Sequence, residues 1–119
     1  MNISTHNIIS FSDYTKRIQI INEAYINHTD ILGLSKTNIT SKQSLHIKKE
    51  ISNKFVSFFN NDSSKFKPKG SGVAILVKPL LAPYITNHKG KQGRYIYVDF
   101  SFRNHNKLRI FQVYLHAHP

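Results

Sequence analysis

The sequence predicts an α+β fold in which a mixed, mostly antiparallel sheet carries two helices on one face. Two observations support this prediction. The first third of the chain alternates strand, helix and strand, and the last half contains a series of short strands joined by turns. The 119 residues suffice for one domain with one small core, so residues 1–119 are treated as a single domain.

The first helix is predicted from the spacing of apolar residues. Residues 3–9 alternate loosely and are rich in β-branched side chains, which is typical of a strand. Residues 10–13 then offer side chains that cap a helix. Apolar residues follow at steps of three and four, at Tyr14, Ile18, Ile21 and Tyr25. One face of this helix can therefore pack inward.

The middle of the chain gives weaker signals. Residues 31–35 form a short apolar run of the kind found in strands buried on both faces. Residues 41–53 fit either a weakly amphipathic, strongly basic helix or an irregular excursion. Residues 54–59 are aromatic enough for a strand, and residues 60–70 predict a polar loop.

Three later stretches have the pattern of strands, at 72–77, 94–102 and 107–115, with residues 103–106 as a hairpin turn. The run at 73–77 is apolar on successive residues, like the run at 31–34, so both faces of these strands must be buried. Two helices on one face cover only half of this surface, and we expect the other face to need a further layer.

Composition narrows the function classes. The 17 Lys and Arg against 6 Asp and Glu give a net charge of +11, which favours polyanionic partners such as nucleic acid. The absence of cysteine excludes disulfides, thiol nucleophiles and thiolate zinc sites. There is no long apolar run and no signal-peptide pattern, so the sequence predicts an intracellular protein, cytoplasmic or nuclear, without a membrane span.

Five segments together resemble a known family. They are residues 3–8 (ISTHNI), 30–37 (DILGLSKT), 70–77 (GSGVAILV), 94–102 (RYIYVDFSF) and 113–115 (VYL). In order and spacing they are similar to strands of the endonuclease/exonuclease/phosphatase superfamily, which has the deoxyribonuclease I-like fold. The closest likeness is to endonuclease domains of non-LTR retrotransposons, and it extends over nearly the whole chain.

The resemblance implies the first half of a four-layer α/β/β/α sandwich, and hence a truncated domain with one sheet face bare. It also implies hydrolysis of phosphodiesters with Mg²⁺. The family's Glu ligand falls at Lys36, whose ammonium offers no lone pair to a cation. The family's later motifs, Asp-x-Asn and Ser-Asp-His, have no counterpart in these residues. We therefore expect this chain alone to bind no metal and to be catalytically inactive.

Two family site positions are unchanged. Asn7 matches the Asn beside the metal, and Tyr114 matches the Tyr beside the phosphate. Each has a plainer interpretation, because an Asn that ends a strand is often a turn residue and a Tyr in a strand is often a core residue. The Pro that follows the Tyr in the family is His116 here, so the family pattern departs in this loop.

Basic residues suggest an alternative function, a non-catalytic module that binds DNA or RNA without sequence specificity. Lys and Arg displace counterions from phosphates without reading bases. The candidate residues are Lys65, Lys67, Lys69, Lys89, Lys91 and Arg94. The competing interpretation is a solvated basic face with no partner.

Two other patterns are weak. His116 and His118 alternate without a third ligand, which is poor support for a metal site. The string Gly70-Ser71-Gly72 precedes a strand rather than a helix, so a tight turn is favoured over a phosphate-binding loop. A third hypothesis is that an uncovered sheet face pairs with another copy of the chain or with a separately encoded second half.

Overall fold

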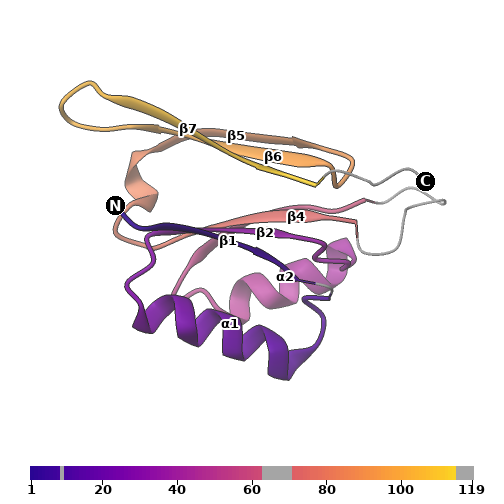
Figure 1. The fold of residues 1–119 in the computed structure, drawn as a ribbon. Helices are drawn as coiled ribbons and strands as arrows, with labels where there is room; N and C mark the ends of the chain where they lie inside the picture. Colours follow the sequence, from indigo (N-terminus) through magenta and orange to yellow (C-terminus); the bar gives the residue numbers. More distant parts are fainter. Residues whose placement is uncertain (9, 63–70, 115–119) are drawn as a thin grey trace.

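The computed structural model describes residues 1–8, 10–62 and 71–114, and it confirms the α+β class. The elements in chain order are β1 (Ile3–Asn7), α1 (Tyr14–Ile26), β2 (Ile31–Ser35), α2 (Ser41–Glu50), β3 (Val56–Asn60), β4 (Val73–Val77), the short 3-10 helix η1 (Ala82–Tyr84), β5 (Ile85–Lys91), β6 (Tyr95–Ser101) and β7 (Lys107–Val113). They form three layers, which are the two helices, a four-stranded first sheet and a three-stranded second sheet (Figure 1).

The first sheet is mixed and has the strand order β1-β2-β4-β3. Strands β1 and β2 are parallel because helix α1 carries the chain back between them, whereas β4 pairs antiparallel with both β2 and β3. The second sheet is an antiparallel meander of β5, β6 and β7. The predicted turn at 103–106 joins β6 to β7, and the Phe102 amide donates to the Asn106 carbonyl over 2.9 Å.

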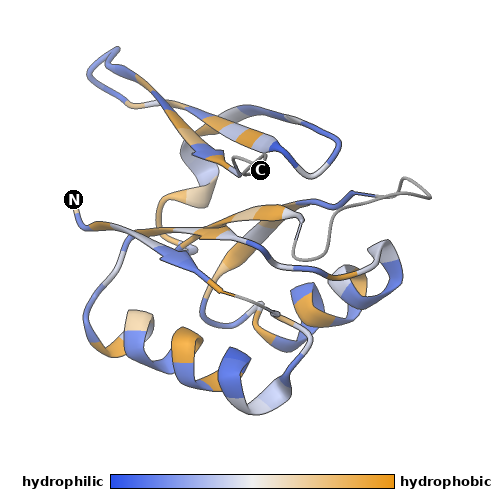
Figure 2. Ribbon diagram, turned by 45° about the vertical axis from the view of Figure 1, so that its right-hand side comes forward, coloured by the Kyte–Doolittle hydropathy of each residue, from blue (hydrophilic) through white to orange (hydrophobic). Residues whose placement is uncertain are grey.

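Both helices lie on one face of the first sheet, as predicted (Figures 1 and 2). Helix α1 begins where the Asp13 carboxylate accepts a hydrogen bond from the Lys16 amide. Helix α2 begins with a capping box between Thr40 and Gln43, so the helical alternative for this stretch is the correct one. Neither helix is long and apolar enough to cross a bilayer, among the residues that the structure describes.

Two apolar clusters occupy the two faces of the first sheet. Leu32, Leu34 and Leu76 pack against the helices. Their neighbours along the strands point the other way and pack against β6 and β7 of the second sheet, as Ile31 and Ile75 do. Strands β2 and β4 are therefore buried on both faces, as their apolar runs predict.

The expectation of a bare face on the first sheet is wrong. The covering layer lies within the chain itself, because β5, β6 and β7 fold back over β2 and β4. Strand β5 was not predicted, since its sequence ITNHKGK is polar and nearly all of it is exposed at a sheet edge. Among the described residues, no helix or strand covers the outer face of the second sheet.

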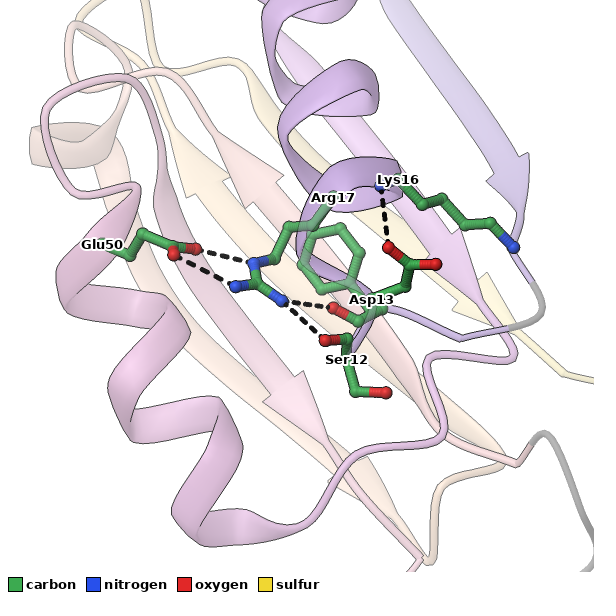
Figure 3. Close-up of polar contacts among 6 residues, drawn as sticks. Ser12, Asp13, Lys16, Arg17 and Glu50 are labelled. Carbon is green, nitrogen blue, oxygen red and sulfur yellow. Dashed lines mark hydrogen bonds and ion pairs between the residues drawn. The ribbon is translucent and has the colours of Figure 1, made fainter.

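A buried ion pair joins the two helices. The Arg17 side chain is almost fully buried, and its guanidinium donates to both carboxylate oxygens of Glu50 at 2.6 and 3.0 Å (Figure 3). It also donates to the backbone carbonyls of Phe11 and Ser12 at 2.9 and 3.2 Å. One arginine thus fixes α2 and the segment that precedes α1. Nothing in the sequence spacing indicated this pair.

This ion pair predicts a pH-dependent stability. The hydrogen bond from Arg17 lowers the pKa of Glu50, and the Arg17 charge acts in the same direction against desolvation. Because the pKa of Glu50 is lower in the folded protein than its ordinary value of 4.5, the ionised carboxylate stabilises the fold above pH 4.5. This contribution is lost as the pH falls through the folded-state pKa. We expect Glu50→Gln to lower the free energy of unfolding by about 2 kcal/mol at pH 7.

Urea unfolding at several pH values checks this prediction, with Glu23→Gln, at an exposed position on α1, as the control. The difference between the wild type and Glu50→Gln should shrink below pH 4.5. An equal loss of stability in both variants, or a difference that does not change with pH, would contradict it.

Candidate functional site

The candidate site lies at one edge of the sandwich, where β1 and β2 end and β4 begins. Asn7 is the last residue of β1 and pairs in register with Ser35, the last residue of β2. Ser35 in turn pairs with Val73 at the start of β4. Lys36 follows Ser35 directly, so Asn7 and Lys36 lie at the ends of neighbouring strands. We call this place the strand-end edge.

Strand β7 brings Tyr114 to the same edge. The Thr5 hydroxyl of β1 donates to Gln112 of β7 over 3.2 Å, so these two side chains meet between the sheets. Side chains two residues apart share a face of a strand, and β1 and β7 run toward the same end of the molecule (Figure 1). Asn7 and Tyr114, each two residues further on, therefore lie on facing sides of the sandwich.

A glycine permits this approach. Gly33 of β2 pairs with Thr5, and a Cβ at this position would collide with the Gln112 side-chain oxygen. The sequence did not predict that Gln112 approaches the first sheet at this position. A glycine inside an otherwise apolar strand was the available signal, because it often marks a close approach by another segment.

Hydrogen bonds at the strand-end edge link the first sheet to the second and also link residues within the second sheet. The Gly72 amide donates to the Gly93 carbonyl over 3.1 Å, and the Gly93 amide donates to the Asn60 side chain over 2.6 Å. The Tyr114 amide donates to the Arg94 carbonyl over 2.7 Å. Arg94 therefore lies beside Tyr114, and the Tyr114 side chain also packs partly buried against the core between the sheets.

The loop after β2 is held in place by its backbone. Lys36 has a φ of +58°, which is unusual for a residue with a side chain. Beyond it the Thr37 amide donates to Gly72 over 3.3 Å, and the Asn38 amide donates to Ser71 over 2.8 Å. The Lys36 side chain is half-buried. The backbone of Lys36 is thus held at this edge by a constrained turn.

The chemistry of this edge suits anions better than cations. Asn7 offers an amide, Tyr114 a hydroxyl, and Lys36 and Arg94 offer only positive charge. In the part of the chain that the structure describes, no three His, Asp or Glu side chains are close enough together to hold a metal ion. These residues do not fit Mg²⁺, which requires oxygen ligands in its first coordination sphere.

Three of the six predicted nucleic-acid residues are described. Lys89 and Lys91 are exposed on β5, and Arg94 is exposed just beyond it, where its amide donates to the Lys91 carbonyl over 2.8 Å. The other three, Lys65, Lys67 and Lys69, lie outside the described residues, as do His116 and His118.

Comparison with known proteins shows the fold and no close relative. No family model matches the chain, and no curated protein matches it. Among solved structures, the chain is similar to humanized D. rerio TDP2 carrying 14 mutations, with a TM-score of 0.58 and 11% sequence identity. The similarity covers 90% of this chain and 46% of that chain.

TDP2 has the endonuclease/exonuclease/phosphatase (deoxyribonuclease I-like) fold. This chain therefore has an α+β fold that matches about half of a chain of that fold. At 11% identity the similarity concerns the fold alone, so the roles of Asn7, Lys36 and Tyr114 remain predictions.

The strand-end edge predicts a destabilising substitution at Gly72. This residue has a φ of +108°, and a Cβ here would collide with the Thr37 hydroxyl. We expect Gly72→Ala to lower the free energy of unfolding by about 1 to 3 kcal/mol, measured by urea denaturation. In a double-mutant cycle, Thr37→Ala should recover the steric part of this loss. Unchanged stability of Gly72→Ala would show that the turn is not constrained as described.

Proposed function

We propose that this chain is an endonuclease/exonuclease/phosphatase-like half-domain that does not hydrolyse phosphodiesters by itself. The observation that carries the proposal is Lys36, which occupies the position of the family's metal-binding Glu at the end of β2. The fold similarity supports the family context, and the chain spans about half the length of the similar structure.

The charge at position 36 decides the chemistry. In the family a Mg²⁺ ion would neutralise the phosphate and stabilise the leaving oxygen. An ammonium group cannot coordinate that ion and repels it. The same ammonium attracts a phosphate oxygen, so Asn7, Lys36 and Arg94 can hold a phosphate without activating it. Binding without turnover is the expected behaviour of this edge.

A second candidate function, non-specific binding of DNA or RNA, is favoured by the charge of the whole chain. The net charge is +11, and Lys89, Lys91 and Arg94 are exposed. Such contacts release counterions from the nucleic acid, so the affinity should fall steeply with salt concentration. This function requires no catalytic residue.

The proposal predicts the outcome of a metal-restoring substitution. The purified chain should not nick supercoiled plasmid in the presence of Mg²⁺. Lys36→Glu supplies a carboxylate beside Asn7 and should produce weak Mg²⁺ binding in a calorimetric titration, again without nicking. Lys42→Glu, which makes the same charge change at an exposed position on α2, is the control and should not bind Mg²⁺.

Two results would overturn the proposal. One is Mg²⁺-dependent nicking by the unmodified chain that is lost in Asn7→Ala. The other is nicking by Lys36→Glu, which would show that one carboxylate is enough to complete the site.

A further inference from the structure

The outer face of the second sheet carries an ordered set of aromatic and basic side chains. Ile96, Val98 and Phe100 of β6 point into the core. Successive side chains of a strand point to opposite faces, so Tyr95 and Tyr97 point outward. Residues paired directly across an antiparallel sheet share a face. Lys89 and Phe111 flank Tyr97 in one row, and Lys91 and Val113 flank Tyr95 in the next.

The aromatic rings on this face are contiguous. The ring centroids of Tyr97 and Phe111 are 5.3 Å apart, and those of Tyr95 and Phe111 are 6.5 Å apart. The Arg109 guanidinium lies over the Tyr97 ring, 4.1 Å from its centroid. Phe111 is 53% exposed, although a ring of this size is usually buried. The rings are tilted by 52° and 53° to one another, and together with the guanidinium they form one contiguous surface, which we call the aromatic platform.

Cations outnumber anions on this face. Lys89 and Lys91 border the platform on the β5 side, and Lys107 and Arg109 are exposed on β7. The one carboxylate in these three strands is Asp99, and both of its oxygens accept hydrogen bonds from Arg109 at 2.6 and 3.0 Å. The net charge of the platform and its border is positive, which is complementary to a polyanion.

We propose that the aromatic platform binds single-stranded nucleic acid. Unpaired bases stack on Phe111 and on the Arg109 guanidinium that covers Tyr97, while Lys89 and Lys91 contact the phosphates along the β5 side. The inference rests on the proposed nucleic-acid binding and narrows it to one surface and one class of ligand. The platform adjoins the strand-end edge, because the Arg94 amide donates to the Lys91 carbonyl over 2.8 Å, and it requires no metal.

The form of the surface explains why the ligand is single-stranded. In a duplex the flat faces of the bases are stacked on one another, so only unpaired bases can lie on an exposed protein ring. The exposed Phe111 ring and the Arg109 guanidinium on the neighbouring Tyr97 ring offer more than one such contact. Rings and ammonium groups do not distinguish ribose from deoxyribose, so the inference covers both RNA and DNA.

The same features argue against a protein partner at the platform. Charged residues are depleted at the centre of protein interfaces, and Lys in particular is rare there. A covering protein layer would have to desolvate Lys89 and Lys91 together, which is costly unless each is paired. A nucleic acid instead supplies a phosphate for each ammonium.

The first test compares ligands and platform variants by fluorescence anisotropy. A labelled single strand of about 15 thymidines should bind more tightly than a duplex of the same length at the same salt concentration. Phe111→Ala and Tyr97→Leu should each weaken single-strand binding roughly 5- to 150-fold. Tyr97→Phe keeps the ring and should bind normally. Tyr14→Ala, at a ring that is 62% exposed on α1, is the control and should also bind normally.

The second test separates position from net charge. The pair Lys89→Gln and Lys91→Gln removes two charges beside the platform, and the pair Lys48→Gln and Lys49→Gln removes two charges from exposed positions on α2. Only the first pair should weaken binding strongly, and it should reduce the slope of log affinity against log salt by roughly 1.4. Circular dichroism and thermal unfolding establish that every variant is folded.

Each negative result of these tests leads to a different conclusion. Absence of any affinity for single strands would overturn both this inference and the proposed nucleic-acid binding. Affinity that does not depend on Tyr97 or Phe111 would overturn the platform alone and leave a diffuse basic surface as the binding site. A dimer in sedimentation velocity that Phe111→Ala converts to a monomer, with unchanged single-strand binding, would assign the platform to a second copy of the chain and overturn the inference.

Discussion

Strand β4 has both of its faces in the protein core, and the arrangement of every other layer follows from this. All five residues of Val73–Val77 are buried, with alternate side chains directed toward the helices and toward the second sheet. Exposing either face would put a row of branched apolar side chains into water. The helices satisfy one face, and the β5–β7 meander must return over the other. Figure 2 shows hydrophobic and hydrophilic residues alternating along the strands of the second sheet, which has one face in the core.

Packing two sheets in this way also creates the strand-end edge. Parallel β1 and β2 end together, antiparallel β4 begins beside them, and β7 ends above them because Gln112 fits over Gly33. Hydrogen bonds through Gly72 and Gly93 join the two sheets at this edge. The geometry is therefore a product of the core and does not depend on which charge stands at position 36.

The second sheet has a different role on each side. Its inner face completes the core with Ile96, Val98 and Phe100, while its outer face exposes rings beside cations. In a four-layer sandwich a further layer would cover this outer face. The positive charge of its border is unusual for a surface that is buried against protein. The strand-end edge and the aromatic platform adjoin at Lys91 and Arg94, and basic side chains are exposed at both.

The sequence by itself determined the fold class, the first helix and six of the seven strands, because those depend on local periodicity and on apolar runs. It left the second helix as one of two alternatives, and the structure shows the helix. The sequence also placed Asn7, Lys36 and Tyr114 at strand ends. Only the tertiary structure showed that the polar segment Ile85–Lys91 forms a strand, because an exposed edge strand has no apolar pattern that predicts it. It likewise decided the Arg17–Glu50 pair and the alignment of Lys89 with Tyr97 and Phe111. Each of these depends on which segments meet in space, and local sequence carries no information about partners that are distant along the chain.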